Sequence, residues 1–452
     1  MAYTIDNAPL SWRHYYITGV ASLGQLIGTG LATLVSVVIP LYQLVAHPEL
    51  SSMMQGLVGA MDLIGIMVGS TILGKLSDRY GYVWLFRLCP AIVLAASVVT
   101  LIFPSLPVLI VCLFFMGFGI GGEYSLDSNY ISQLLPTRWA FLMVGAAKAA
   151  SALGNIAAAG ICFLVIRKWT NADLWPHLLW IMIVISGLMI VLRIKWWESP
   201  KWLLTHGRTA QAETDTHHFL GPDVNVATSD IKPGEVHGDS SDKPAQPGFF
   251  KRNWKNIIFT GVPWACEGLG VYGIGVFLPI LVMALGLEPA ATHESPIKDV
   301  TSSVQITLWI SCIILPGFVL GLALINHVQG AKIQWWGFLL SAIFLFILLL
   351  AYHNHWPKWI SIGSFMAFEL FLNMGPHLMT FVLPPKVYPV ADRGLGSGIA
   401  ASLGKVGAVL GVFFIPILLN VGGSKLVLIV SIIVMLVGGA ITFIFNPERH
   451  AK

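Results

Sequence analysis

Charged side chains are scarce in this 452-residue chain: 11% of its residues are Asp, Glu, Lys or Arg, whereas 56% are hydrophobic. Soluble domains carry about 25% charged residues, so this sequence cannot build a water-facing surface of ordinary polarity. The scarcity of charge excludes a soluble globular enzyme. The formal net charge of +4 is also too small to indicate a nucleic-acid partner.

Paired cysteines and cofactor motifs are missing as well. The five cysteines all fall inside apolar runs, without the spacing of a disulfide framework or a zinc site, so we interpret them as packed thiols. The sequence contains no ATP-binding loop, nucleophile elbow or metal cluster. We therefore expect no cofactor and no enzymatic reaction. Any transport would draw its energy from an ion gradient or from the gradient of the substrate.

Long apolar runs make up most of the chain. Twelve membrane helices of about 20 residues each would use roughly 240 residues, slightly less than the hydrophobic content. Cutting the runs at charge clusters and Gly/Pro breaks gives twelve predicted spans. They cover residues 15–45, 53–74, 84–104, 106–130, 140–166, 174–194, 256–285, 302–326, 333–352, 358–384, 395–421 and 424–445. The first is too long for the apolar core of a signal peptide, so we expect it to remain in the protein.

One long polar stretch, residues 196–255, separates six spans from six. It is rich in Ser, Asp, Gly, Pro and His, as expected of a linker. We therefore predict an all-α membrane protein with twelve transmembrane helices in two six-helix bundles. The predicted bundles comprise residues 1–195 and 256–452, and the linker between them is predicted to be cytoplasmic.

The distribution of Lys and Arg indicates an orientation. With both termini in the cytoplasm, the cytoplasmic segments hold 19 basic residues, Arg193 among them, and the other face holds five. The remaining two, Lys148 and Lys405, fall within spans. This excess satisfies the positive-inside rule. We predict a multi-pass protein of a cell membrane, a bacterial inner membrane by its short length, with both termini cytoplasmic.

The loop between the second and third spans carries the pattern G-x-L-x-D-R-x-G. A glycine there lets helices approach closely, Asp78 can cap the next helix or pair with a cation, and Arg79 can anchor the loop at the interface. At this place in the topology the pattern resembles the signature loop of the major facilitator superfamily. The resemblance implies two pseudo-symmetric bundles around a central site. It also implies a gating role for the loop residues Gly74, Asp78, Arg79 and Gly81.

Further motifs resemble particular branches of that superfamily. The stretch that starts at Glu198, E-S-P-K-W-L, resembles the sugar porters. The N-x-G-P-H element at Asn373 and the S-G and K-x-G-A elements around Lys405 resemble phosphate:proton symporters and their organic-anion relatives. Trp264 and Tyr272 have the spacing found in phosphate carriers, and the G-x-G-x-G-G-E-Y run of the fourth span is similar to that branch and to metabolite:proton symporters.

The sequence also departs from the phosphate carriers. Their span-seven aspartate, four residues after the tryptophan, is Gly268 here, with Glu267 beside it. The first span carries no acidic residue. The resemblance therefore implies a solute carrier related to the phosphate carriers and leaves the solute open.

Apart from basic residues near the span ends, which are counted with the loops above, seven charged residues fall within predicted spans. Each costs on the order of 2.5–3.5 kcal/mol even on the lenient insertion scale, so each suggests a function. The seven are Asp62, Glu123, Asp127, Lys148, Glu267, Glu369 and Lys405. Because five of the seven are acids and two are bases, some of the acids can be protonated. Such protonation is a condition for proton coupling.

Lys405 has small neighbours that allow a cavity around its ammonium, where it can bind an anion; alternatively it pairs permanently with Glu369 or Glu267. Lys148 occupies the corresponding span of the other half and shares a helix face with Ser151. Lys148 can bind the anion from the side opposite Lys405, or it can neutralise Glu123 or Asp127 of span four. The predicted substrate-binding residues are Lys405, Lys148, Asn373, Tyr272, Trp264, Tyr124 and Ser151.

Glu123 and Asp127 are four residues apart and share a helix face, so either can carry a coupling proton. The alternative for Asp127 is an anchoring role near the cytosolic end. Glu123 is favoured because it matches an acid of the family motif. The full set of predicted proton-coupling residues is Glu123, Glu267, Asp127, Asp62 and Glu369.

These observations predict a secondary active transporter, monomeric in the lipid bilayer, that imports a small organic or inorganic anion with protons by alternating access. One alternative is a porter for sugars or other neutral solutes. Another is a transporter-like receptor that senses a solute without moving it. A membrane enzyme is the least favoured class, since no nucleophile-base pair or metal set is visible in the sequence.

Overall fold

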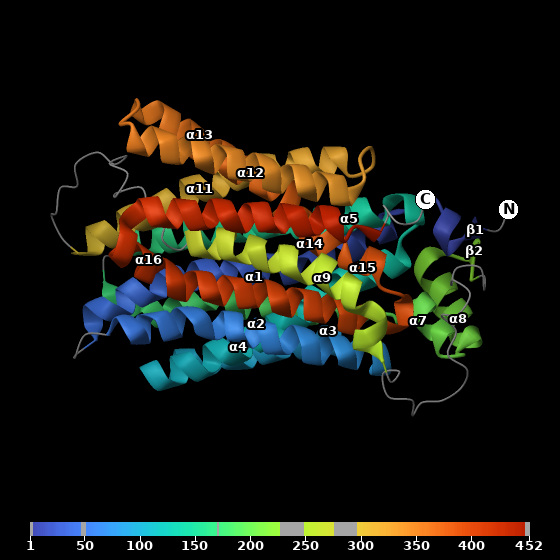
Figure 1. The fold of residues 1–452 in the computed structure, drawn as a ribbon. Coiled ribbons are helices and arrows are strands. Elements are labelled where there is room, and N and C mark those ends of the chain that lie inside the picture. The colour runs from blue at the N-terminus through green and yellow to red at the C-terminus, as the bar shows by residue number, and fades with distance from the viewer. Residues whose placement is uncertain (1–2, 47–50, 170, 227–247, 275–295, 448–452) are drawn as a thin grey trace.

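The computed structural model describes residues 3–46, 51–169, 171–226, 248–274 and 296–447. It is an elongated bundle of long helices that run side by side (Figure 1). The strand β1 (Tyr3–Thr4) and the helices α7 (Pro200–Thr205) and α8 (Thr209–Leu220) lie together at one end of this bundle, which we call the α7–α8 end. The last part of the seventh predicted span, residues 275–285, and linker residues 227–247 lie outside the described residues.

The first half of the chain follows the predicted spans closely. Its elements are β1 (Tyr3–Thr4), η1 (Ile5–Asn7), α1 (Trp12–Val45), α2 (Ser52–Tyr80), α3 (Leu85–Ile102), α4 (Leu106–Leu134), α5 (Thr137–Trp169), η2 (Ala172–Leu179) and α6 (Trp180–Leu192). Six membrane-length segments result, since η2 and α6 together form one span of 21 residues.

The second half contains more interruptions. Its elements are α9 (Phe249–Gly268), η4 (Leu269–Ile274), α11 (Pro296–Leu324), α12 (Gly330–His353), α13 (Lys358–Leu372), η5 (Asn373–His377), α14 (Leu378–Val382), α15 (Pro384–Val387), η6 (Val390–Asp392) and α16 (Arg393–Ile444). The non-helical angles of Gly423 divide α16 into two spans, at the predicted break between residues 421 and 424.

Nine helices of the described residues are long and apolar enough to cross a membrane. The other three predicted spans coincide with α9 and η4, with α11, and with the series α13, η5 and α14. The elements therefore fit the predicted twelve-span, all-α architecture. Two of these three segments contain a π-helical turn, a feature that is frequent at functional sites.

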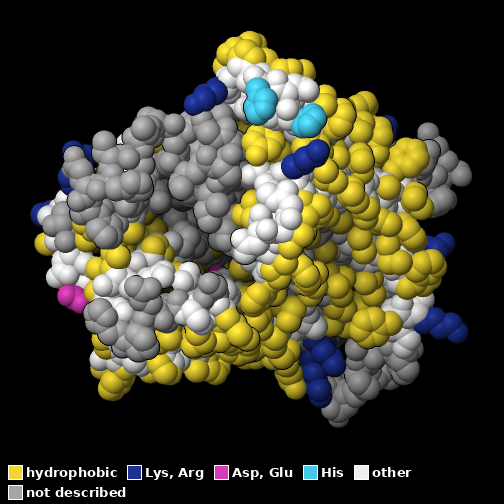
Figure 2. All heavy atoms as spheres, turned by 60° about the vertical axis from the view of Figure 1, so that its left-hand side comes forward, with side chains coloured by type: hydrophobic (Ala, Val, Ile, Leu, Met, Phe, Trp, Pro, Cys, Tyr) yellow, Lys and Arg dark blue, Asp and Glu magenta, His cyan; other side chains and the backbone are white. Residues whose placement is uncertain are grey.

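Apolar side chains face both the interior and the outside of the bundle. Leu164, Val184 and Ile433 are more than half exposed on its flanks, at 64%, 62% and 55%. Figure 2 shows broad areas of apolar side chains with few Lys and Arg among them on one face. Such a surface suits lipid rather than water.

The polar linker contains structure of its own. It forms α7 (Pro200–Thr205), α8 (Thr209–Leu220) and the short strand β2 (Val224–Asn225) before the part that is not described. β2 pairs in parallel with β1. The beginning of the chain is thereby tied to the linker.

Candidate transport site

Two buried lysines from different halves of the chain lie against one aromatic ring. Lys405 on α16 places its Nζ 4.9 Å from the centroid of the Tyr124 ring, and Lys148 on α5 places its Nζ 5.2 Å from it. Each lysine is 3% exposed. Lys405 Nζ also donates a hydrogen bond of 2.6 Å to the hydroxyl of Tyr272. The fold thus brings together residues that the sequence separates by more than 250 positions.

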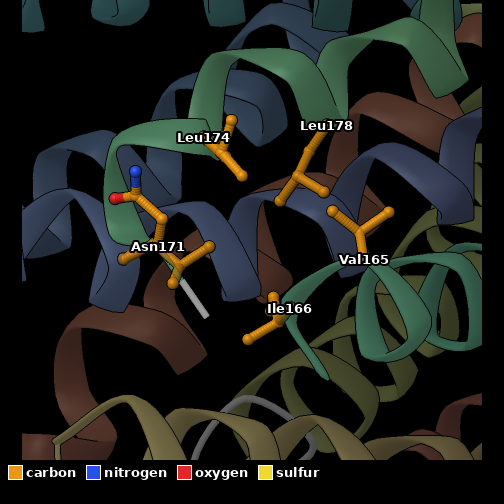
Figure 3. A pocket seen from close by; sticks show the side chains of 6 residues that line it. Val165, Ile166, Asn171, Leu174 and Leu178 are labelled. Carbon is orange, nitrogen blue, oxygen red and sulfur yellow. The ribbon is translucent and has the colours of Figure 1, made fainter. Parts of the chain in front are cut away.

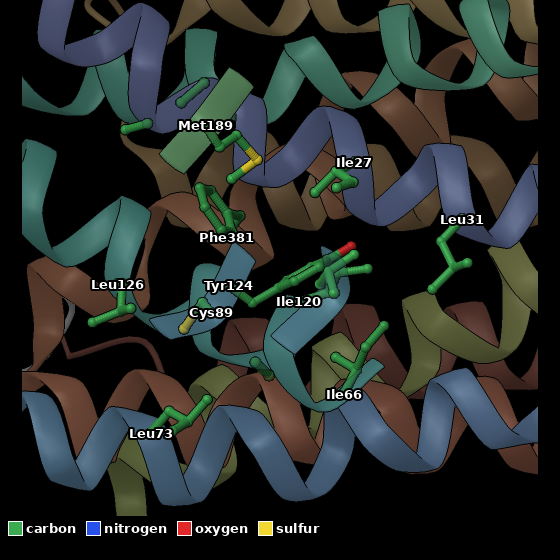
Figure 4. Close-up of a cluster of buried hydrophobic side chains, with 14 of the residues drawn as sticks. Ile27, Leu31, Ile66, Leu73, Cys89, Ile120, Tyr124, Leu126, Met189 and Phe381 are labelled. Atoms are coloured by element: carbon green, nitrogen blue, oxygen red, sulfur yellow. The ribbon is translucent and has the colours of Figure 1, made fainter. Parts of the chain in front are cut away.

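Aromatic rings from three helices surround these ammonium groups. The centroids of Tyr124, Trp264 and Phe381 lie 6.3 to 6.5 Å from one another. Figure 4 shows Tyr124 and Phe381 side by side within the buried cluster. Lys148 Nζ is 5.7 Å from the Phe381 ring. Such ring faces attract a cation without neutralising it.

The two lysines have no carboxylate at ion-pairing distance among the described residues. Glu267 interacts electrostatically with both of them, and Asp62 with Lys405, at longer range. The permanent pairing of Lys405 with Glu267 or Glu369, which the sequence left open, is therefore not the arrangement found. A buried cation without a carboxylate partner is costly in free energy.

Glu267 instead pairs with His377. The distance from Glu267 Oε1 to His377 Nδ1 is 2.6 Å, and the side chains are 3% and 9% exposed. His377 ends the π turn η5, which also contains Pro376 and Asn373. Proline cannot donate a backbone hydrogen bond, so it favours such a break in the helix. The break places His377 beside α9.

The acids of span four have a partner that the sequence analysis assigned to a loop. Arg193 Nη1 lies 2.7 Å from Glu123 Oε1, and its Nη2 lies 3.8 Å from Asp127 Oδ1. The sequence analysis counted Arg193 among the cytoplasmic segments and gave it no partner, whereas its side chain is fully buried against these acids. It caps the end of α6 and also donates to the backbone carbonyls of Phe86 and Val20, at 3.2 Å each.

The first span contributes an amide to this acid cluster. Gln25 Nε2 donates a hydrogen bond of 3.1 Å to Asp127 Oδ2. Two carboxyl groups, Glu123 and Asp127, thus face one guanidinium group. One negative charge is left over when both acids are ionised, and a single proton would balance the cluster.

The remaining predicted residues have other surroundings. Asn373 donates to the backbone oxygen of Glu369 at 2.8 Å and to its Oε2 at 3.2 Å, so these two form a buried pair. The backbone oxygen of Ser151 accepts a hydrogen bond of 2.7 Å from Thr29, which fixes α5 against α1. Asp62 is 2% exposed on α2. Within the described part of the chain, no hydrogen bond or ion pair joins Asn373 or Ser151 to the two lysines.

The signature loop joins the two halves at the α7–α8 end. Asp78 accepts hydrogen bonds from the backbone N–H groups of Gly394 at 2.8 Å and Leu395 at 2.7 Å, so it caps α16. Gly74 allows the close approach, since a Cβ there would lie 2.4 Å from the Gly394 oxygen. Arg79 lies over the Tyr80 ring, with 5.1 Å to its centroid.

Gly81 ends α2 with a φ of +88°, and a Cβ there would lie 2.3 Å from Glu198 Oε2. The Glu198 carboxylate accepts hydrogen bonds from the backbone N–H groups of Tyr82, Val83 and Ser199. Burial raises the pKa of Glu198, and these N–H groups oppose the rise. The sugar-porter-like motif therefore fastens the linker to the loop between α2 and α3.

Comparison with known proteins decides the family. The model of the family described as sugar (and other) transporter matches residues 27–452. The chain belongs to this transporter family. The inner membrane metabolite transport protein YgcS of Escherichia coli K12 is 26% identical over 449 residues, which cover 99% of this chain and 94% of that protein. The probable inorganic phosphate transporter 1-6 of Arabidopsis thaliana is 24% identical over 489 residues, with coverage of 99% and 94%.

A solved structure agrees with the sequence relatives. The proton:xylose symporter XylE of the major facilitator superfamily, bound to 6-bromo-6-deoxy-D-glucose, superposes with a TM-score of 0.81 at 19% identity and covers 96% of each chain. The predicted major facilitator fold is confirmed. The protein is a multi-pass membrane transporter of small molecules and, as predicted, not an enzyme.

The transporter site was only partly visible in the sequence. Arg193 was missed because it stands at the end of its predicted span, where it was counted with the basic residues of the linker. The two unpaired acids four residues apart in span four were a signal that a cation must be near. Phe381 was missed because an aromatic residue in an apolar run is most often packing. The two lysines were found because each is a charge inside an apolar run. Arg193 was counted with the loops and Phe381 carries no charge, so neither was selected in this way.

A small cavity between α5 and η2 is not a second transport site. It is lined by Val165, Ile166, Asn171, Leu174 and Leu178 (Figure 3), together with Leu41. Its volume of about 10 Å³ is at the limit for one water molecule, far below that of a metabolite.

Proposed function

We propose that this transporter imports a small anion together with protons by alternating access. The observation that carries the proposal is the pair Lys148 and Lys405, which come from different halves and share the Tyr124 ring without a carboxylate partner among the described residues. An anion between them would complete the charge balance and hold the two halves together. The proposed moving units are residues 1–195 and 256–452, joined by the linker 196–255.

The Glu123, Asp127 and Arg193 cluster supports proton coupling. It is buried and holds one more acid than base, so it can exchange a proton without a second cation. It lies in the first half, next to Tyr124 in sequence. Because α4 carries both these acids and Tyr124, a proton bound by the cluster would affect the anion site through this helix. The Glu267 and His377 pair is the corresponding candidate in the second half.

The test removes the charge of Lys405. Proteoliposomes with an inward proton gradient are offered labelled inorganic phosphate, a monocarboxylate and a dicarboxylate, and the anion that wild-type protein accumulates is then used for the variants. We expect Lys405→Ala to weaken binding of that anion about tenfold or more, since a charged hydrogen bond is lost. Lys425→Ala, an exposed lysine of the same helix, serves as the control and should behave as wild type.

Two results would contradict the proposal. If Lys405→Ala binds the anion as wild type does, the lysine pair is not the anion site. If wild-type protein accumulates and exchanges none of the anions, the substrate lies in another class. Absence of exchange for every solute would indicate a receptor.

A neutral solute is the second candidate, favoured by the rings of Trp264, Tyr124 and Phe381, which can pack against the face of a sugar. Labelled xylose and glucose therefore belong in the same experiment. Accumulation of a sugar that is insensitive to Lys405→Ala would select this candidate.

We also propose a bacterial inner membrane with the α7–α8 end in the cytoplasm. A cysteine introduced as Ser241→Cys, in a variant with the exposed Cys312 replaced by Ser, should react with an impermeant reagent only from the cytoplasmic side. Labelling from the opposite side would reverse the orientation.

A further inference from the structure

Asp62 is a buried acid with no close partner. It stands on α2, is 2% exposed, and its Oδ1 has no hydrogen-bond partner among the described residues. The acids Glu123, Glu267 and Glu369, in contrast, each have a partner at hydrogen-bond or ion-pair distance. Buried polar atoms are nearly always hydrogen-bonded, and an acceptor without a hydrogen bond destabilises the protein. The exposed edge of this carboxyl group is therefore a candidate for a contact with the solute.

The surroundings of Asp62 place it near the lysine pair. It interacts electrostatically with Lys405 and with Tyr272, the two groups that a hydrogen bond of 2.6 Å joins. Its neighbour Leu63 packs in one buried cluster with Tyr272 and with Ala408, three residues after Lys405 on α16. An acid of the first half thus lies near the ammonium group of the second half, beyond ion-pairing distance.

Close packing fixes the backbone of α2 at this point. Gly117 on α4 lies against α2, since a Cβ there would be 2.1 Å from the backbone oxygen of Asp62. Ile66, one turn further along α2, belongs to the same buried cluster as Ile120 and Tyr124 of α4 (Figure 4). The carboxyl group is therefore carried by two tightly packed helices, which suits a group that selects a ligand.

The charges around the site leave room for one further negative charge. Lys148 and Lys405 supply two positive charges, and Asp62 offsets one of them at longer range. Glu267 is engaged with His377, at 2.6 Å. A monoanion balances the charge that remains, whereas a dianion would add an uncompensated negative charge in a buried place.

The rings at the site are matched to a carbon skeleton. Trp264, Phe381 and Tyr124 surround the ammonium groups, with centroids 6.3 to 6.5 Å apart. Inorganic phosphate has no apolar atoms to cover the faces of these rings, whereas the C–H groups of a hydroxylated chain or ring can pack on them. An acid without hydroxyl groups would cover the rings but would offer the acceptor Asp62 no hydrogen.

From these three features we propose that the transported anion is a hydroxylated monocarboxylate, such as a sugar acid. Its carboxylate would bind Lys148 and Lys405, its carbon skeleton would pack on the rings, and one hydroxyl group would donate a hydrogen bond to Asp62. The inference rests on the proposed function of the lysine pair and adds the class of anion to it. Asp62 is then a residue that determines specificity and not a carrier of the coupling proton.

The experiment compares carboxylates that differ in their hydroxyl groups. Isothermal calorimetry measures the binding of gluconate and hexanoate, and of the shorter pair glycerate and propionate, to the purified full-length protein. We expect wild-type protein to bind the hydroxylated member of a pair at least about tenfold more tightly. The reason is that a site built to hydrogen-bond a hydroxyl group discriminates strongly against the analogue that lacks it.

Substitution of Asp62 should remove the preference without removing the anion. In Asp62→Ala we expect the preference to fall about tenfold, with the affinity for the unsubstituted acid unchanged or slightly higher because an offsetting charge is gone. Asp62→Asn keeps an acceptor and should retain part of the preference. Binding of the unsubstituted acid shows that each variant is folded. Asp173→Ala, at an exposed acid of the same half, is the matched control.

Four results would overturn the inference. Equal affinity of wild-type protein for both members of each pair would do so, and so would an unchanged preference in Asp62→Ala. An equal loss of affinity for both members in this variant would assign Asp62 to helix packing instead. Loss of accumulation in proteoliposomes, with the preference intact, would make it a coupling residue.

Two further ligands, inorganic phosphate and glucose, separate this inference from the proposed function. If phosphate binds, no carboxylate does, and Lys405→Ala loses the phosphate, the lysine pair remains the anion site and only the hydroxylated class is wrong. If glucose alone binds and Lys405→Ala leaves its affinity unchanged, both proposals are wrong.

Discussion

The two buried charge groups of this transporter differ in how their charge is balanced. Glu123, Asp127 and Arg193 belong to one half and compensate one another at short distance. Lys148 and Lys405 come from different halves and share an aromatic ring without a described carboxylate partner. The first arrangement is complete within one bundle. The second leaves positive charge without a described counter-ion between the bundles, where the proposed function would place an anion.

The largest expected effect comes from breaking the balanced cluster. Arg193→Ala leaves two buried carboxyl groups without a cation, and we expect a loss of about 3–5 kcal/mol in the free energy of unfolding. A lowered melting temperature of the purified protein would show it. The control is Arg167→Ala, an exposed arginine of the same half.

The double variant Arg193→Ala with Glu123→Gln should recover part of that loss, because it removes one of the orphaned charges. If Arg193→Ala melts as wild type does, the cluster is not the balanced unit described above.

Next in size is the loss of coupling in Glu123→Gln. Glutamine still accepts the hydrogen bond from Arg193 but cannot take up a proton. We expect the variant to exchange solute across the membrane yet to accumulate none against a gradient, as measured by uptake and counterflow in proteoliposomes. Glu213→Gln, an exposed position on α8, is the control. Undiminished accumulation would remove Glu123 from the coupling role.

At the lysine pair, removal of an acid should strengthen function rather than weaken it. Glu267→Gln removes the negative charge that partly offsets the two lysines, so we expect anion affinity to rise about two- to fivefold. Isothermal calorimetry with the accumulated anion measures it. Glu369→Gln removes an acid that pairs with Asn373 instead and should leave the affinity unchanged. Weaker anion binding in Glu267→Gln would show that this carboxyl group positions the site rather than opposing it.

The smallest effect is expected at the ring that sequence reasoning overlooked. Phe381→Leu removes one of the two rings near Lys148, a contact of about 0.5–1 kcal/mol, so anion affinity should change by less than about fivefold. Phe344→Leu, at a ring that stacks on Phe371 away from the lysines, provides the comparison. A complete loss of binding in Phe381→Leu alone would mean that the ring contacts the solute directly.

Much of the architecture could be predicted from local pattern. The spans, the break near Gly423 and the polar linker follow from lengths of apolar sequence and from where charge and glycine interrupt them. The π turns η4 and η5 could not be predicted in this way, because they depend on how a helix adapts to its neighbours. They reposition Tyr272 and His377 at the site.

Many individual residues of the candidate site could be predicted from the sequence, but their ion-pair partners could not. Lys148, Lys405 and Glu123 were selected because each is a charge inside an apolar run. Arg193, the ion-pair partner of Glu123, was not selected, because ion pairing depends on distances between helices that are far apart in sequence. Arg193 illustrates this: its place at the end of α6 does not reveal that its guanidinium lies 2.7 Å from Glu123.

The sequence by itself determined that this protein resides in a membrane, is built from two sets of six spans and keeps a few charges where they are expensive. Those properties depend on composition and on the length of apolar runs. The tertiary structure decided which charges neutralise one another and which do not, since Coulomb interactions weaken with separation and strengthen with burial. It set Arg193 against two acids within one half and left Lys148 and Lys405 together between the halves, without a described counter-ion.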